Sequence, residues 1–338
     1  MTEEGLLVSI VVPIYNEVET VDELCRRLHS ALSQVTDYEL VLIDDGSTDG
    51  SWDLLLAQAA RDPRLRAARL SRNFGHQIAI TAGLDLARGD AVVIMDGDLQ
   101  HPPEVIPALL ERWRDGYDVV YAVRSEQGSE ARFKRSSASA FYRLLRALAE
   151  VDIPAEAGDF RLLSRRAVDA IGAMPERARF LRGMAAWIGY RQIAVPYESA
   201  PRYAGKTKYP LRRMLHLAAD GITSFSAAPL RLVSMLGFLF VLFCAGYLFY
   251  VLYIHFLTDR TIEGWTTVVV LILLIGGVQL LSLGIVGQYV ARVFDEAKRR
   301  PLYLFESVVE GGHVTDGNAG GKGTARPSRN APYAPPSE

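Results

Sequence analysis

The chain begins with a regular alternation between short apolar runs and longer segments in which apolar residues recur every three or four positions. The apolar runs, rich in β-branched residues, lie at 8–14, 40–43, 91–95 and 119–122. Runs of this length are typical of buried strands, and the pattern between them is typical of helices that bury one face. The sequence therefore predicts an α/β domain with a mostly parallel sheet covered by helices.

Polar clusters end or follow three of these predicted strands. Their sequences are PIYNE at 13–17, DDGSTDGS at 44–51 and DGDLQ at 96–100. The carboxyl ends of parallel strands meet at one edge of a sheet, and α/β sheets bind ligands at that edge. We therefore expect the three clusters to line a common crevice.

The third cluster predicts a metal site. Asp96 and Asp98 are separated by one residue, and Gln100 follows shortly after. Their oxygens suit Mg²⁺ or Mn²⁺ bridging the phosphates of a nucleotide, where the metal neutralises charge on a departing diphosphate. An ordinary polar turn is the alternative interpretation, since Asp and Gly are common turn residues. Neither a GxxxxGK[ST] loop nor a GxGxxG turn after the first strand is present, which disfavours an ATPase and a dehydrogenase.

Two long apolar runs lie further along the chain, at 232–257 and 265–290, and neither contains Asp, Glu, Lys or Arg. Each reaches the roughly 20 residues that a helix needs to cross a bilayer. Buried core helices are the alternative, but two such runs in succession favour a transmembrane hairpin.

The charges around the hairpin predict its orientation. Positive flanks favour the cytoplasmic side, and Arg or Lys occurs on both flanks, at 212, 213, 231, 292 and 298–300. The amino terminus passes from acidic residues directly into a strand and shows no signal-peptide pattern. We therefore expect a multi-pass protein of the cell inner (plasma) membrane with a cytoplasmic amino-terminal domain.

These patterns divide the chain into five segments. Residues 211–230 mix apolar and basic positions as an interfacial amphipathic helix does, although an ordinary surface helix fits equally well. The end of the chain is rich in Gly, Pro, Ser and Asn and is predicted to be disordered. The formal net charge of −2 gives no reason to expect a nucleic-acid partner. The expected segments are a cytoplasmic α/β domain at 1–210, a juxtamembrane segment at 211–230, a transmembrane hairpin at 231–292, a cytoplasmic juxtamembrane segment at 293–310 and a disordered tail at 311–338.

Six segments together resemble the inverting family 2 glycosyltransferases, and within them the membrane-anchored polyprenyl-phosphate glycosyltransferases, a group that includes bactoprenol glucosyltransferases and dolichol-phosphate mannosyltransferase-like enzymes. The segments are VVPIYNE at 11–17, DDGSTDGS at 44–51, SRNFGHQIAITAGLDLARGD at 71–90, MDGDLQHPPE at 95–104, GDFRLLSRR at 158–166 and RYAGKTKYP at 202–210. The resemblance extends to about residue 300. It implies a GT-A nucleotide-sugar-binding domain followed by two transmembrane helices.

The resemblance also implies a donor side of the site. Its nucleotide pocket would be lined by Pro13, Tyr15, Glu17 and Asp44. Asp96 would face the sugar or the ribose, and Asp98 with Gln100 would hold the metal, Mg²⁺ or Mn²⁺.

On the acceptor side, Asp159 falls where the family places an acid near the acceptor; pairing with Arg161 or capping a turn is the alternative. Arg124 and Arg135 match basic residues that receive the lipid phosphate, and Lys206 and Lys208 are further candidates. Arg132 and Lys134 could extend this basic cradle, because arginine and lysine bind phosphate well; an exposed basic surface is the alternative.

The expected reaction is inverting transfer of a single hexose, with glucose favoured, from a UDP-sugar to undecaprenyl (polyprenyl) phosphate at the cytoplasmic face, giving a lipid-linked sugar donor for cell-envelope glycans. The acceptor phosphate is already largely ionised near neutral pH, so positioning matters more than a strong base. The alternatives are an enzyme that uses GDP-mannose or a UDP-N-acetylhexosamine, and a non-catalytic nucleotide-sugar sensor. Family members with two membrane helices can form tetramers, so the resemblance allows a homo-oligomer. His76 and His101 are not assigned to the site, because a lone histidine is more often structural.

Overall fold

The computed structural model describes residues 5–35, 37–124, 157–198, 228–257 and 264–316. These residues fall into two units. One unit combines the chain up to residue 198 with residues from 300 onward, and the other runs from 228 to 299.

The first unit is built on a nine-stranded sheet with the order β7-β5-β6-β4-β1-β2-β3-β8-β9. Its centre, from β4 to β3, is parallel, whereas β6 runs antiparallel to both β4 and β5, and β8 runs antiparallel to β3 and β9. The strands are β1 (Leu7–Ile14), β2 (Asp37–Asp44), β3 (Leu65–Leu70), β4 (Ala91–Ile94), β5 (Val119–Arg124), β6 (Ala157–Ser164), β7 (Gln192–Tyr197), β8 (Phe305–Glu310) and β9 (His313–Asp316).

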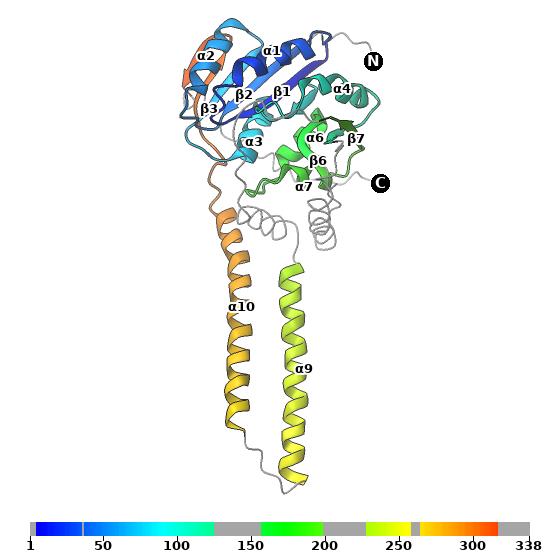
Figure 1. Ribbon diagram of the computed structural model, residues 1–338, viewed down its shortest axis with the longest axis vertical. Helices are drawn as coiled ribbons and strands as arrows, with labels where there is room; N and C mark the ends of the chain where they lie inside the picture. The colour runs from blue at the N-terminus through cyan, green and yellow to red at the C-terminus, as the bar shows by residue number, and fades with distance from the viewer. Residues whose placement is uncertain (1–4, 36, 125–156, 199–227, 258–263, 317–338) are drawn as a thin grey trace, which may run out of the picture. The chain divides into compact units, whose positions relative to one another are not determined.

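Helices cover both faces of this sheet (Figure 1). The larger core lies between the sheet and three helices, where Ile10, Leu24, Leu42, Leu55 and Leu109 are fully buried. The helices of this unit are α1 (Val21–Ala31), α2 (Ser51–Arg61), α3 (His76–Leu86), the 3₁₀ turn η1 (Pro103–Val105), α4 (Ile106–Arg114), α6 (Arg165–Ala173) and α7 (Leu181–Trp187). The predicted α/β domain with a mostly parallel central sheet is confirmed, and all four apolar runs form strands.

The structure adds strands that the apolar pattern did not indicate. The sequence of β3 is LRAARL, in which two arginines interrupt the apolar run. The strands β8 and β9 lie in segments expected as juxtamembrane (293–310) and disordered (311–338). The chain after the long apolar helices therefore returns to the sheet and extends it beyond β3.

The second unit contains two long helices, α9 (Ala228–Leu257) and α10 (Trp265–Ala297). Among the described residues, one stretch is long and apolar enough to cross a membrane, Leu274–Ala297 in α10. A shorter apolar stretch, Gly237–Tyr247, lies in α9. The helical character of both runs is confirmed, whereas a crossing by both helices stays a prediction. Most of the expected amphipathic segment at 211–230 lies outside the described residues.

Helix α3 lies very close to the sheet at one glycine. A Cβ atom on Gly83 would lie 2.3 Å from Cγ1 of Val11, which belongs to β1. A larger residue would force the helix away from the sheet. Because α3 begins at His76, this contact also fixes where the amino end of the helix lies.

We expect Gly83→Ala to destabilise the protein by about 2 kcal/mol, because an added methyl group overpacks a tight contact. The measurement is the midpoint of thermal unfolding of the purified protein in detergent. Gly172→Ala in α6 is the matched control, since a Cβ there would meet nothing within 4 Å. Alanine favours helix over glycine, so the control should keep or raise the midpoint. Equal losses in both variants would contradict this account of the α3 contact.

Candidate active site

The first two polar clusters join at the carboxyl ends of β1 and β2. Asn16 adopts a left-handed backbone conformation with φ of 55°. Its backbone N–H donates to Oγ of Ser47 at 2.9 Å, and its Oδ1 accepts the N–H of Thr48 at 2.9 Å. The N–H of Glu17 donates to Oγ of Ser51 at 3.0 Å. The expected contact between these two clusters is therefore present.

Asp44 is completely buried at the end of β2. Its carboxylate accepts the N–H of Ser47 at 3.2 and 3.3 Å and lies 3.2 Å from Nε of Arg69. Burial raises the pKa of the Asp44 carboxyl, although the contacts with Ser47 and Arg69 oppose that shift. A nucleotide that bound Asp44 directly would have to replace one of these contacts.

Asp45 connects this edge to the segment that precedes α3. Its oxygens accept the backbone N–H groups of Phe74 and Gly75 at 2.7 and 2.9 Å. Burial raises the pKa of the Asp45 carboxyl, and these two hydrogen bonds oppose the shift. The neighbouring Gly46, with φ of 72°, lies so close that an added Cβ would come within 2.7 Å of the backbone of Arg72.

The third cluster packs against the end of β1. A Cβ on Gly97 would lie 2.7 Å from Cδ1 of Ile14, so a larger residue here would have to displace that side chain. Asp98 caps the same turn by accepting the N–H of Gln100 at 3.1 Å. All three clusters therefore lie at one edge of the sheet, and the common crevice expected between them stays a prediction.

Asp96 lies between two histidines. Its Oδ1 is 3.3 Å from Nε2 of His76, and its Oδ2 is 3.5 Å from Nδ1 of His101, which also accepts the backbone N–H of Asp96 at 3.0 Å. His101 is buried and stacks on Phe160 at 5.1 Å, in keeping with a structural role. Burial raises the pKa of the Asp96 carboxyl.

Asp159 reaches the same edge because β6 is antiparallel to β4. Arg161 pairs with Ile94, the last residue of β4, so Asp159 lies beyond that end. Its carboxylate accepts a fork from Arg182, with Nε and Nη2 at 2.8 and 3.0 Å, and a hydrogen bond from Nε2 of Gln77 at 3.2 Å. The carboxylate thus has several cationic and polar donors and is not isolated.

The charges of this group depend on one another. Burial alone would raise the pKa of Asp159, but hydrogen bonds from His76 and Arg182 outweigh it and hold that pKa well below its usual range. Burial alone would lower the pKa of His76, but Asp159, 3.4 Å from its Nε2, and Asp96 raise it. The structure therefore favours a charged carboxylate at Asp159 and a histidine that is easily protonated.

Sequence reasoning missed three residues of this group. His76 and Gln77 begin α3, and Arg182 lies in α7. The signal available for the first two was their place inside the matching segment at 71–90, directly after Gly75. Arg161, expected as an alternative partner of Asp159, instead donates to the carbonyl of Gly158 at 2.7 Å.

The other expected residues are partly described. Pro13 is buried in β1, Tyr15 is 48% exposed, and Glu17 accepts a hydrogen bond from Oγ1 of Thr20 at 3.2 Å. Arg124 is exposed at the end of β5. Outside the described residues lie Arg132, Lys134, Arg135, Lys206 and Lys208.

The residues after β4 fit a divalent cation. Oδ1 of Asp96 is buried and makes no hydrogen bond among the described residues, and its 3.3 Å contact with Nε2 of His76 is an ion pair only when the imidazole is protonated. A hard cation satisfies such an oxygen. Among all the residues that the structure describes, no three His, Cys, Asp or Glu side chains are grouped so that they could hold a metal by themselves. A cation here would therefore need further oxygen ligands, from Gln100 and from a bound phosphate.

Comparison with known proteins shows that this edge lies within a region that matches a known protein family. The model of the family described as Glycosyl transferase family 2 matches residues 9–172, which include every described site residue above except Arg182. Uncharacterized glycosyltransferase YkcC from Bacillus subtilis is 48% identical over 299 residues, covering 88% of this chain and 93% of that protein. Uncharacterized glycosyltransferase sll0501 from Synechocystis is 41% identical over 297 residues, covering 88% and 93%. Bactoprenol glucosyl transferase from Shigella phage SfV is 37% identical over 302 residues, covering 89% and 98%.

We expect Asp159→Asn to lower stability by about 2 kcal/mol or more, because it removes the charge that balances a partly buried arginine. Glu104→Gln is the matched control. Glu104 also accepts a two-pronged contact, from Arg27 at 2.6 and 3.0 Å, but its side chain is 56% exposed, so the loss should stay below about 1 kcal/mol. The measurement is chemical unfolding in detergent followed by tryptophan fluorescence. A control that loses as much as Asp159→Asn would show that burial of the pair does not matter.

Proposed function

The chain belongs to glycosyl transferase family 2, and from that premise we propose that it transfers a single hexose from a UDP-sugar to a polyprenyl phosphate such as undecaprenyl phosphate. Glucose is the favoured sugar, and the anomeric carbon is inverted. The reaction takes place at the cytoplasmic face of the inner membrane. Its product is a lipid-linked sugar donor for cell-envelope glycans.

The extent of the similarity carries this proposal. Relatives named bactoprenol glucosyl transferase match about nine-tenths of this chain at 37% and 38% identity. Such a match leaves too few residues outside it to omit both α9 and α10. The similarity therefore includes the helical unit as well as the sheet, and it supports a lipid acceptor rather than a soluble one.

On the donor side, the proposed nucleotide pocket is the edge formed by Pro13, Tyr15, Glu17 and Asp44. The half-exposed ring of Tyr15 suits stacking on a nucleobase. Asp98, Gln100 and Asp96 would hold Mg²⁺ or Mn²⁺. When bound, this cation supplies charge neutralisation to the leaving diphosphate.

On the acceptor side, Asp159 is proposed as the acid that arranges the cations around the reacting groups. Its low pKa keeps it charged, and its contacts orient Arg182 and His76. An ionised acceptor phosphate needs little proton removal, so fixed cations that bring two anions together contribute more. Arg124, Arg135 and Lys206 are proposed to bind the lipid phosphate.

Two alternatives remain for the donor and one for the class of protein. GDP-mannose or a UDP-N-acetylhexosamine would use the same diphosphate and metal contacts. A non-catalytic nucleotide-sugar sensor would keep the pocket and lose turnover. The intact acids Asp96, Asp98 and Asp159 favour an enzyme. A homo-oligomer is part of the proposal, with no particular number of subunits.

The test is an incubation of the detergent-solubilised protein with Mn²⁺, undecaprenyl phosphate and a panel of radiolabelled nucleotide sugars. We expect label in the organic extract with UDP-glucose. Label from another donor alone would correct the sugar and keep the reaction. No label from any donor, with UDP binding intact, would support the sensor.

In the same assay, Asp98→Ala should reduce turnover by at least about 100-fold, because the proposed cation loses a ligand oxygen. The fold should persist, so the thermal midpoint should change little. Asp115→Ala is the control, because it removes a carboxylate that is not part of the proposed site. Asp115 lies just after α4 and contacts Arg112 at 3.1 Å. An active Asp98→Ala protein would remove the metal assignment.

A further inference from the structure

The strand β8 contains one irregularity in its pairing with β3, next to Arg69. In the pairing of β8 with β3, Arg69 lies opposite Ser307 and the next residue, Leu70, lies opposite Phe305. Glu306 is therefore the extra residue of a β-bulge. Bulges redirect the side chain of the extra residue and are common beside functional sites.

The redirected carboxylate contacts Arg69. An oxygen of Glu306 lies 3.4 Å from Nε of Arg69, and the same Nε lies 3.2 Å from Oδ2 of Asp44. Nη2 of Arg69 donates to the carbonyl of Ser47 at 3.2 Å. One guanidinium thus joins β8 to the buried acid and to the loop that follows β2.

A second contact connects β8 to the edge of the sheet. The carbonyl of Leu304, directly before β8, accepts the N–H of Ser71 at 2.9 Å. Ser71 begins the segment whose later residues Phe74 and Gly75 donate to Asp45. The start of β8 therefore supports the edge at two points.

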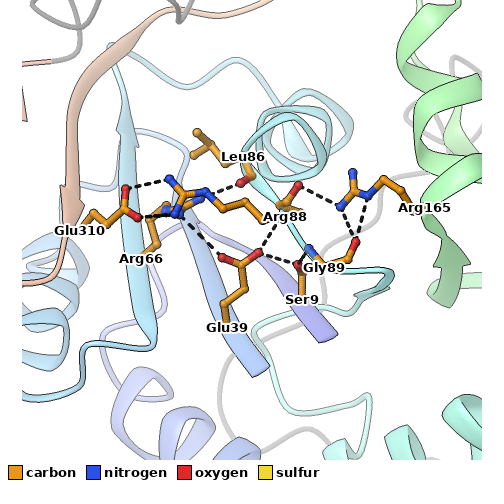
Figure 2. Close-up of polar contacts among 9 residues, drawn as sticks. Ser9, Glu39, Arg66, Leu86, Arg88, Gly89, Arg165 and Glu310 are labelled. Atoms are coloured by element: carbon orange, nitrogen blue, oxygen red, sulfur yellow. Dashed lines mark hydrogen bonds and ion pairs between the residues drawn. The ribbon is translucent and has the colours of Figure 1, made fainter. Parts of the chain in front are cut away.

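The other end of β8 provides a natural comparison. Glu310 pairs with Arg66, also from β3, at 2.8 Å and with Arg88 at 2.6 Å (Figure 2). Its side chain is 51% exposed, close to the 56% of Glu306. The network around Glu310 includes Glu39, Ser9 and Arg165, and it lies at the opposite end of the strands from Asp44.

We propose that Glu306 is a positioning residue of the donor pocket: it holds Arg69 against Asp44 and Ser47, so the pocket is incomplete without the strand that follows the two long helices in the sequence. This inference rests on the proposed function, because that function identifies the edge as the donor pocket. When a nucleotide occupies one oxygen of Asp44, Glu306 keeps the guanidinium paired and in place. The role requires a negative charge at 306 and a positive charge at 69.

The experiment titrates the full-length protein in detergent with UDP by calorimetry. Glu306→Gln should weaken UDP binding by about threefold, since an ion-pair partner of Arg69 is lost. Glu310→Gln, which removes a similarly exposed carboxylate from the same strand, should stay within about twofold of wild type. Arg69→Met should weaken binding by about tenfold or more, and Arg69→Lys should recover part of that loss.

Turnover separates positioning from general damage. Glu306→Gln should raise KM for the nucleotide sugar and leave kcat unchanged, because it acts on donor binding and not on the reacting atoms. Equal effects of Glu306→Gln and Glu310→Gln on UDP binding would overturn the inference, since a common loss of strand order would explain both. Unaltered binding by Glu306→Gln would overturn it as well.

A titration with GDP distinguishes the inference from the proposed function. If the wild type binds GDP in place of UDP and Glu306→Gln weakens that binding, the inference stands and the proposed donor fails. If the wild type binds UDP and the variant binds it equally well, the inference fails and the donor stands. Binding of neither nucleotide by the wild type overturns both.

Discussion

The need to stabilise buried carboxylates determines the structure at the edge of the sheet that carries the candidate site. Asp44, Asp45, Asp96 and Asp159 all lie where strands end, away from most of the solvent. A buried carboxylate is costly unless donors or cations compensate it. Backbone N–H groups compensate Asp45, whereas Arg69 and Arg182 serve Asp44 and Asp159. These contacts connect the loops around the edge to the strand ends.

Much of this edge could be predicted from the sequence, because its acids directly follow the strands that position them. The apolar runs of β2 and β4 are uninterrupted, and that of β1 contains only Ser9 as a polar residue; each run leads directly into a polar cluster, so strand and site could be predicted together. The resemblance added Asp159 from its GDFR segment. The two long apolar runs likewise predicted α9 and α10, and a bilayer crossing by both stays a prediction.

The partners of the acids could not be predicted in the same way, since they come from distant positions. Gln77 lies 82 residues from Asp159, and Arg182 lies 23 residues away, in another helix. No spacing rule connects such positions before the fold is known. His76 was set aside because a single histidine carries little information, and its significance comes from the two carboxylates that face it. The strand β3 was missed for a related reason: Arg66 and Arg69 break its apolar pattern, yet both are used in ion pairs with β8.

The late position of β8 has a consequence for biosynthesis. Arg66 in β3 and Glu310 in β8 are separated by 244 positions, and both α9 and α10 lie between them. Chains emerge from the ribosome amino end first, and early segments begin to fold during synthesis. In the nascent domain, the edge of β3 that pairs with β8 therefore stays unpaired until both long helices have been translated. The order of translation therefore ensures that the sheet is completed only after both hydrophobic helices have been made.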